Sequence, residues 1–342
     1  MIVYHFWPEK IHALPKVSLS FIKDIDNDWV IISNEDSNHK GEIVFKGIKV
    51  KYCNPSLEDY TKYKDVFFCG SLFGVLYFNK IIKNSNKFAI LTSKKYKTKE
   101  LLSIRLRDIF VSKSLLKNLL TNISLKLIPN YFLRKSIQSY KKIYVPSNYF
   151  VNETRKIVGD HSKIMLLGLE RKNSTRKIHK SHKKFKILFV GHSYITRGLD
   201  VLALVFDSIM KEHSLKDVEL NIVVNPMYER EKELNYIKKV LKKVSSYKNV
   251  NIKLEYVGNL NDYYQDAHIL VYPYRYLPDI LAYPLVILEA KSYGCKIITS
   301  NFPNNLEIVD SNDYIINPKS IKELKNAILV EYNKFKGEKN DV

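Results

Sequence analysis

The stretch YPLVILEAKSYGCKIITS, residues 283–300, shows how the second half of the chain folds. Its apolar residues recur at helical spacing up to Tyr293, Gly294 is typical of a helix end, and CKIITS is rich in β-branched residues. We predict a helix over 284–294 and a buried strand over 295–300. Glu289 is the one acid in this run, and an unpaired buried carboxylate costs several kcal/mol. We therefore expect it to face solvent or to meet hydrogen-bond donors.

The same alternation of strand and helix extends through the second half. No hairpin turn separates its strands, so the pattern predicts βαβ units and a parallel, doubly wound sheet. The predicted strands are 184–191, 218–225, 250–258, 268–274, 295–300 and 313–317, and the predicted helices are 199–213, 228–246, 261–266 and 284–294.

The first half follows a similar but less regular pattern, which predicts a second Rossmann-like α/β domain. Residues 99–141 stand out, because Leu and Ile alternate with Lys and Arg as in two amphipathic helices broken at Pro129. The predicted strands are 1–6, 28–33, 47–53, 65–70, 87–93, 142–147 and 163–168. The domain boundaries that we predict are 1–170 for the basic amino-terminal domain, 171–185 for a linker, 186–320 for the carboxyl-terminal domain and 321–342 for a final helix and tail.

Charge is distributed unevenly along the chain. The net charge is +21, and residues 1–184 contribute +20 of it, with 35 Lys and Arg against 15 Asp and Glu. This asymmetry favours an anionic partner for the first half, which could be nucleic acid, a membrane surface or a phosphorylated substrate, although such charge also serves solubility alone. We find no nucleic-acid-binding motif in the first half, so a nucleic-acid partner is the weaker alternative.

The sequence indicates a cytoplasmic protein. Three scattered cysteines provide neither a disulfide framework nor a zinc site, and we expect reduced thiols. The first ten residues lack the pattern of a signal peptide, and no apolar run reaches about 18 residues.

The segment FVGHSYITRGLDVL, residues 189–202, is the first candidate binding site. A glycine directly after a strand, and Arg197-Gly198 at the start of a helix, are a layout that holds an anion on backbone N–H groups, with the guanidinium bonding phosphate. The other interpretation is an ordinary tight turn between strand and helix.

Several motifs together resemble a known family. FVG (189–191) with a basic residue six positions later, LEYVG (254–258), DAHILVYP (266–273), PLVILEAKSYGCKIITS (284–300) and NNLEIV (304–309) are similar to the nucleotide-sugar-binding domain of GT-B glycosyltransferases, close to glycosyltransferase family 4, also called group 1. The resemblance covers residues 186–318. It implies a GT-B fold, in which two Rossmann-like domains face a central cleft.

The resemblance also implies an activity. A sugar would pass from a nucleotide diphosphate sugar, UDP- or GDP-linked, to a lipid-linked, glycan or protein acceptor held by the amino-terminal domain. It implies retention of anomeric configuration and no cofactor. We expect no requirement for a metal, because Arg197 and helix amides can offset the diphosphate charge. Two other classes stay open, a noncatalytic or repurposed GT-B protein such as a sugar-nucleotide epimerase, and a nucleic-acid-binding protein.

Site residues carry over to matching positions. Glu289 would bind the ribose hydroxyls, and Arg197, at the place of the family's usual lysine, the diphosphate. Glu307 matches an acid that we interpret as structural. The other matches are Gly191 and Gly198, which allow close backbone approach, Val257 and Gly258 near the base, and Pro284, Leu285 and Val286, whose backbone amides would face phosphate or sugar.

The chain departs from the family pattern at several positions. His192 replaces a basic residue after the first glycine and is a weaker diphosphate ligand, and Leu281 replaces a first glutamate, for which Asp279 is a candidate substitute. The segment 6–16 lacks the family's paired glycines. No clear catalytic base emerges, because Ser93 stands where many members have histidine; the candidates are His5, His12 and Asp279.

Two further segments carry alternatives. The DID sequence at 24–26 matches a metal-binding pattern of other glycosyltransferases, but a loop acid is expected there anyway. Residues 99–141 would form core helices, or would lie on an anionic bilayer, where each basic side chain contributes about 1 kcal/mol. The second interpretation would make the protein peripheral on a membrane and would bring a lipid-linked acceptor to it.

Overall fold

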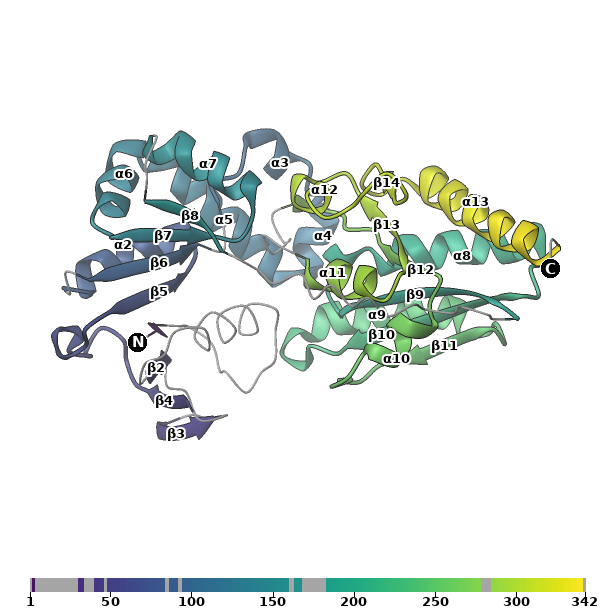
Figure 1. The fold of residues 1–342 in the computed structure, drawn as a ribbon, viewed down its shortest axis with the longest axis horizontal. Coiled ribbons are helices and arrows are strands. Elements are labelled where there is room, and N and C mark those ends of the chain that lie inside the picture. Colours follow the sequence, from purple (N-terminus) through teal and green to yellow (C-terminus); the bar gives the residue numbers. More distant parts are fainter. Residues whose placement is uncertain are drawn as a thin grey trace. The chain divides into compact units, whose positions relative to one another are not determined.

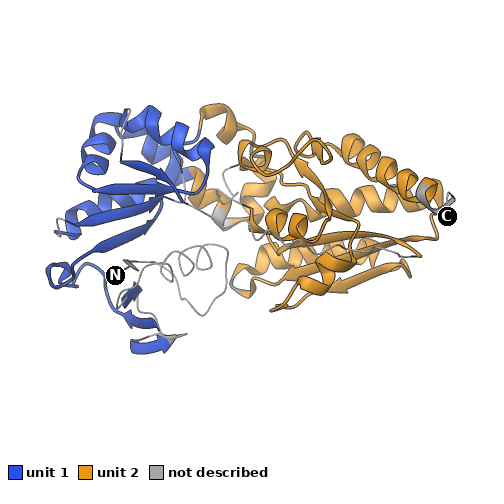
Figure 2. Cartoon of the chain, viewed as in Figure 1, with its two compact units in different colours: residues 1–96, 120–170, 281–283 blue, residues 97–119, 171–280, 284–342 orange. Residues whose placement is uncertain are grey.

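The computed structural model describes residues 2–3, 30–33, 40–45, 48–83, 86–91, 94–159, 163–167, 183–277 and 284–340. The chain divides into two compact units (Figure 2). Unit 1 consists of residues 1–96, 120–170 and 281–283, and unit 2 of residues 97–119, 171–280 and 284–342. The predictions outside the described residues concern His5, His12, the acids at 24–26, Ser93, Asp279, Leu281 and most of the linker.

Unit 1 contains an eight-stranded sheet in the order β3-β4-β2-β1-β5-β6-β7-β8 (Figure 1). Every neighbouring pair is parallel except β3 and β4. The strands are β1 (Ile2–Val3), β2 (Val30–Ser33), β3 (Gly41–Phe45), β4 (Ile48–Tyr52), β5 (Val66–Gly70), β6 (Lys87–Leu91), β7 (Lys142–Val145) and β8 (Ile164–Leu166). The helices α2 (Leu72–Ile81), α6 (Asn130–Gln138) and α7 (Asn148–Val158) belong to this unit, with the short helix η1 (Tyr60–Lys62).

The predicted parallel α/β domain is therefore present in unit 1, with one strand that we did not predict. β3 pairs antiparallel with β4 along its whole length. Its residues 41–44 are exposed, so burial imposes no apolar pattern on them, and the backbone ladder alone defines the strand.

Unit 2 contains a six-stranded sheet in the order β11-β10-β9-β12-β13-β14, parallel throughout. Its strands are β9 (Phe185–His192), β10 (Val218–Asn225), β11 (Val250–Lys253), β12 (Ile269–Tyr272), β13 (Lys296–Ser300) and β14 (Tyr314–Ile316). Its helices include η2 (Ile195–Arg197), α8 (Leu199–His213), η3 (Tyr228–Arg230), α9 (Glu231–Val244), α10 (Asn261–Asp266), α11 (Leu285–Ser292), α12 (Pro303–Leu306) and α13 (Ile321–Asn340). The predicted order of elements is confirmed, and β11 ends five residues earlier than predicted.

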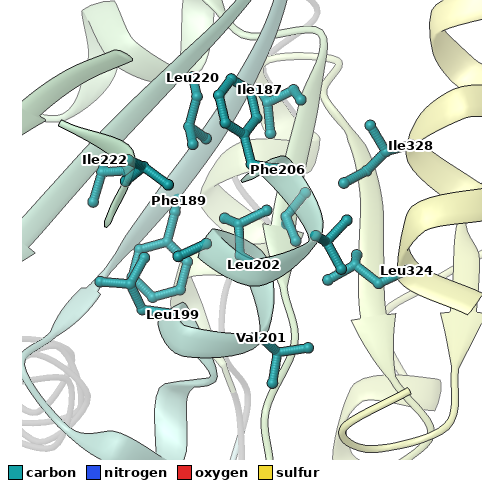
Figure 3. Packing of buried hydrophobic residues seen from close by; sticks show 14 of the residues in the cluster. Ile187, Phe189, Leu199, Val201, Leu202, Phe206, Leu220, Ile222, Leu324 and Ile328 are labelled. Carbon is teal, nitrogen blue, oxygen red and sulfur yellow. The ribbon is translucent and has the colours of Figure 1, made fainter. Parts of the chain in front are cut away.

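A hydrophobic core lies between this sheet and its helices. Alternate residues of β9, Ile187 and Phe189, face the same layer as Leu220 and Ile222 of β10, as expected for neighbouring strands (Figure 3). Phe206 of α8 packs into this layer, and α13 covers it with Leu324 and Ile328. The predicted carboxyl-terminal helix is therefore part of the core of unit 2.

Residues 97–119 differ most from the predicted boundaries. We placed them in the amino-terminal domain, but they cluster with unit 2 (Figure 2). They form α3 (Thr98–Leu102), α4 (Leu106–Val111) and the first part of α5 (Lys113–Leu127). Ile104 and Leu115 are buried around Tyr276, the residue of unit 2 that anchors them. The predicted break at Pro129 is confirmed, because α6 begins at Asn130, but the stretch before it forms three helices instead of the single helix that we predicted.

Candidate functional site

The order of strands in unit 2 locates the candidate site. β9 has β10 on one side and β12 on the other. The chain continues from β9 through β10 to β11 on one side, and the later strands β12 to β14 are added on the other side, so the strand order reverses between β9 and β12. In open parallel sheets, ligands bind beyond the carboxyl ends of the strands at such a switch point. The segments that leave these ends are residues 193–198 after β9 and 273–277 after β12.

Arg197 ends the short helix η2 and is held by two tyrosines from β12 and its following loop. Its Nη1 donates a hydrogen bond of 3.1 Å to the hydroxyl of Tyr272, and its guanidinium lies 4.4 Å from the centre of the Tyr274 ring. Its buried Nε has no hydrogen-bond partner among the described residues. A guanidinium held in place by ring stacking, with a donor still unused, is suited to bind an anion.

Gly198 brings the two loops into direct contact. Its φ of +76° lies in the left-handed region, and a Cβ built there would stand 2.0 Å from the carbonyl oxygen of Pro273. Only glycine allows this approach. Gly191 lies next to the Arg197 side chain, since a Cβ there would stand 3.7 Å from Arg197 Cγ, an ordinary contact.

Arg275 joins the same loops through buried charge. Its Nη1 bonds Asp200 Oδ2 at 2.9 Å, and its backbone N–H donates to the carbonyl of Thr196 at 2.9 Å. Asp200 lies in the first turn of α8 and also accepts a 2.9 Å hydrogen bond from the hydroxyl of Tyr236. The loop after β9 and the loop after β12 are thus one structural element.

Glu289 accepts a hydrogen bond, as we expected for a carboxylate among apolar residues. The hydroxyl of Tyr264 in α10 donates to Glu289 Oε2 at 2.9 Å, and Glu289 itself is half-buried. Burial, and then the neighbouring carboxylate, raise the pKa of Tyr264 well above its usual value, so the hydroxyl stays a donor. Tyr264 therefore fixes the orientation of the carboxylate.

The remaining predicted residues are dispersed over the same end of the sheet. His192 ends β9, with its ring 5.3 Å from that of Tyr194. Val257 and Gly258 lie in the loop after the edge strand β11, and no contact described here joins them to Arg197. Pro284 caps α11 and does not begin it as predicted, so the helix starts at Leu285. The amides of Leu285 and Val286 belong to the first turn, whose N–H groups lack intrahelical acceptors.

Sequence reasoning missed the residues that hold these groups in place. Tyr272, Tyr274 and Arg275 belong to the run YPYRY at 272–276, where aromatic and basic residues alternate directly after a buried strand. That composition is a usable signal for a site, although it does not reveal the partners. Tyr264 carried no signal, because its role depends on the packing of α10 against α11.

The described residues contain neither grouped metal ligands nor a helix that could span a membrane. Within the ranges given above, no three His, Cys, Asp or Glu side chains are grouped so that they could hold a metal ion. The helices in those ranges are all too short or too polar to cross a membrane.

Comparisons with known proteins show what this α/β domain is similar to. Residues 170–331 match the family described as "Glycosyl transferases group 1". No curated protein matches the chain. The predicted resemblance to group 1 glycosyltransferases is thus confirmed for the carboxyl-terminal half, which contains Arg197, Gly198 and Glu289.

Solved structures extend the likeness over the whole chain. An α,α-trehalose-phosphate synthase (UDP-forming) from Burkholderia xenovorans has a TM-score of 0.67 and 10% identity, covering 96% of this chain and 90% of its own. Sucrose-phosphate synthase from Thermosynechococcus elongatus has a TM-score of 0.68 and 12% identity, with 96% and 88% covered. Anabaena Alr3699/HepE, in complex with UDP and glucose, has a TM-score of 0.65 and 10% identity, again with 96% and 88%. The chain has the GT-B fold of these proteins.

Substitution of Gly198 tests the contact between the two loops. We expect Gly198→Ala to lower the free energy of unfolding by about 2–4 kcal/mol, because the left-handed φ and the clash with Pro273 both carry a cost. Chemical denaturation measures the change. Gly191→Ala is the matched control and should stay within about 1 kcal/mol of wild type. Equal stability of the two variants would contradict the described contact.

Lys319 provides a test by pH. Its Nζ lies 3.9 Å from the centre of the Tyr276 ring and donates to the Ser103 carbonyl at 3.0 Å. Burial, and then Arg105 and Arg275, lower its pKa from 10.5 to about 8. The folded protein therefore holds this proton less tightly than the unfolded chain, which lowers the free energy of unfolding. This loss of stability is present in full below pH 8 and disappears as the pH rises toward 10.5.

We expect wild type to gain stability relative to Lys319→Met between pH 7 and pH 10, by on the order of 1 kcal/mol after allowance for solvent screening. Thermal unfolding of both proteins across this range measures the gain. Lys325→Met, which removes an ammonium on α13, is the control. A constant difference between wild type and Lys319→Met would refute the lowered pKa.

Proposed function

We propose that this protein is a glycosyltransferase that moves a sugar from a nucleotide diphosphate sugar to an acceptor. The observation that carries the proposal is the stacked Arg197 at the switch point of a group 1 glycosyltransferase domain. A UDP-linked donor is favoured over a GDP-linked one by two similar structures, whose names specify a UDP-forming enzyme and a complex with UDP and glucose.

Arg197 would bind the diphosphate and stabilise its charge as the bond to the sugar breaks. Electrostatic stabilisation of developing charge is usually the largest contribution to catalysis. The N–H groups at the start of α11 would add donors at a positive helix end. We propose a retaining transfer of a hexose that needs no metal, because these groups can offset the diphosphate charge.

Glu289 would accept the ribose hydroxyls, with Tyr264 holding its carboxylate in place. Val257 and Gly258 would lie near the base, and His192 would add a weaker contact to the diphosphate. His5, His12 and Asp279 remain the candidate catalytic residues, and they lie outside the described residues.

The class of acceptor is inferred from the exposed apolar residues of the helices α3 to α6. Leu102, Leu106 and Phe110 in unit 2 are 78%, 74% and 77% exposed, and in unit 1 Leu127 and Tyr131 are 80% and 65% exposed. The opposite sides of these helices contain buried residues such as Leu101 and Leu133, as the core interpretation predicts, and the exposed residues are the ones that the interfacial interpretation requires.

The charge of this segment is suited to an anionic bilayer. Glu100 and Asp108 are the only acids between residues 99 and 141, and Asp108 is buried. Exposed apolar and basic side chains on short helices are typical of interfacial membrane binding. We propose a cytoplasmic protein, peripheral on an anionic membrane, that acts on a lipid-linked glycan acceptor rather than on nucleic acid.

A noncatalytic or repurposed GT-B protein is the second candidate. Leu281 favours it, because the family has a glutamate at this position. Such a protein would bind nucleotide sugars and transfer no sugar to any lipid or protein acceptor.

A thermal-shift panel of UDP-, GDP- and ADP-sugars tests the donor site. We expect one nucleotide class to raise the Tm of wild type, because a ligand that binds only the folded state stabilises it. Arg197→Ala and Glu289→Ala should each weaken the binding of that nucleotide by about 10-fold or more, since each removes charge-assisted hydrogen bonds. Glu331→Gln changes a buried carboxylate of α13 that pairs with Lys296, and this variant should bind the nucleotide as wild type does. A wild-type Tm that no nucleotide sugar raises would refute the donor site.

Vesicle flotation tests the membrane surface. We expect wild type to float with vesicles of phosphatidylglycerol and phosphatidylcholine but not with phosphatidylcholine alone. The double variant Leu106→Ser, Phe110→Ser should lose most of this binding, because both side chains are exposed and available for insertion. Val330→Ser, which removes an exposed apolar residue of α13, is the control. Flotation that is indifferent to lipid charge would count against this acceptor.

A further inference from the structure

The segment 97–119 carries a buried carboxylate into unit 2. Asp108 lies in α4 and is 1% exposed, and its Oδ2 bonds Nη2 of Arg275 at 2.7 Å. The hydroxyl of Tyr276 donates to the same carboxylate, and the backbone N–H of Arg105 donates to that hydroxyl at 3.2 Å. An ion pair this deeply buried persists only if its partners satisfy one another.

Arg275 connects Asp108 to the loop after β9. Its guanidinium lies between two carboxylates, Asp108 from α4 and Asp200 from α8. Asp200 comes three residues after Arg197, and the N–H of Arg275 bonds the carbonyl of Thr196, the neighbour of Arg197. Arg275 therefore holds the turn of Arg197 by both its side chain and its backbone.

A second connection reaches the same turn independently. Ser112, which follows α4, donates through Oγ to Glu233 Oε1 at 2.9 Å. The other oxygen of Glu233 accepts a 3.2 Å hydrogen bond from the N–H of Ile195, the first residue of η2. Glu233 is 1% exposed, so water does not compete well for this bridge. The segment thus supports the Arg197 turn from both ends.

The loop of Arg275 also provides the aromatic cradle of Arg197. Tyr274 directly precedes Arg275 and stacks on the Arg197 guanidinium, and Tyr272 accepts its hydrogen bond. A displacement of Arg275 would shift these two side chains and the guanidinium that they hold. Buried side chains move as packed groups rather than one at a time.

We propose that Asp108 is a positioning residue for Arg197, so that the segment 97–119 completes the nucleotide site of unit 2. Asp108 itself touches no ligand. It acts by neutralising Arg275, which fixes the loop that holds Arg197 against the diphosphate. This inference rests on the proposed function.

The test compares UDP with uridine on the full chain, by calorimetric titration at a temperature where each variant is folded. GDP and guanosine are measured in parallel. For Asp108→Asn we expect about 10-fold weaker UDP binding and unchanged uridine binding, because only the diphosphate contact depends on Arg197. Tyr276→Phe, which removes one hydrogen bond to Asp108 and keeps the ring, should show the same selectivity with a smaller loss, and it serves if Asp108→Asn does not fold.

Two controls separate positioning from general destabilisation. Glu331→Gln makes the same chemical change in a buried network with Lys296 and Lys334, and should bind UDP as wild type does. In an Arg197→Ala background, Asp108→Asn should cause no further loss of UDP affinity, because the group that it positions is gone.

Several results would overturn the inference. They are unchanged UDP affinity in Asp108→Asn, equal losses for UDP and uridine, or additive losses in the double variant. A wild-type chain that binds none of the four probes would instead refute the proposed donor site itself, before any variant is compared.

Discussion

The buried guanidinium of Arg275, between Asp108 and Asp200, is the constraint on which the candidate site depends. A charge 5% exposed needs opposite charge at close range, and the two carboxylates come from segments 92 residues apart in sequence. The ion pairs therefore determine which parts of the chain must lie together. They hold α4, the start of α8 and the loop after β12 together within unit 2.

These contacts also determine the position of Arg197, the phosphate-binding group that we propose. Arg197 does not reach its place through its own backbone alone, since Tyr272, Tyr274 and the close approach of Gly198 to Pro273 all belong to the contact between two loops. An arginine, where the resemblance to group 1 glycosyltransferases implies lysine, suits this arrangement, because a planar guanidinium stacks on aromatic rings in a way that an ammonium does not.

Sequence patterns predicted the parts of the fold that depend on local periodicity. The helix over 199–213 and the strand over 218–225 match the structure residue for residue, because each is flanked by clear stops and buries a regular face. β3 was missed because an exposed edge strand carries no burial pattern. The position of residues 97–119 could not be predicted, since it depends on pairing Asp108 with a residue 167 positions away.

The site shows the same division between local and distant information. Arg197, Gly198 and Glu289 could be proposed from motif spacing, whereas Tyr264, Tyr274 and Arg275 act through contacts that no spacing reveals. Glu289 now has a defined partner, so the carboxylate in the apolar helix is explained by the hydroxyl of Tyr264.

Amide hydrogen exchange with and without UDP tests the central claim most directly. If the nucleotide binds where the loops after β9 and β12 meet, and α4 is part of that element, UDP should slow exchange together in residues 193–200, 272–277 and 104–112. The strand β3 and its partner β4 should be unaffected. Protection by UDP that omits the first two segments, or that leaves 104–112 unchanged while the others respond, would contradict the account.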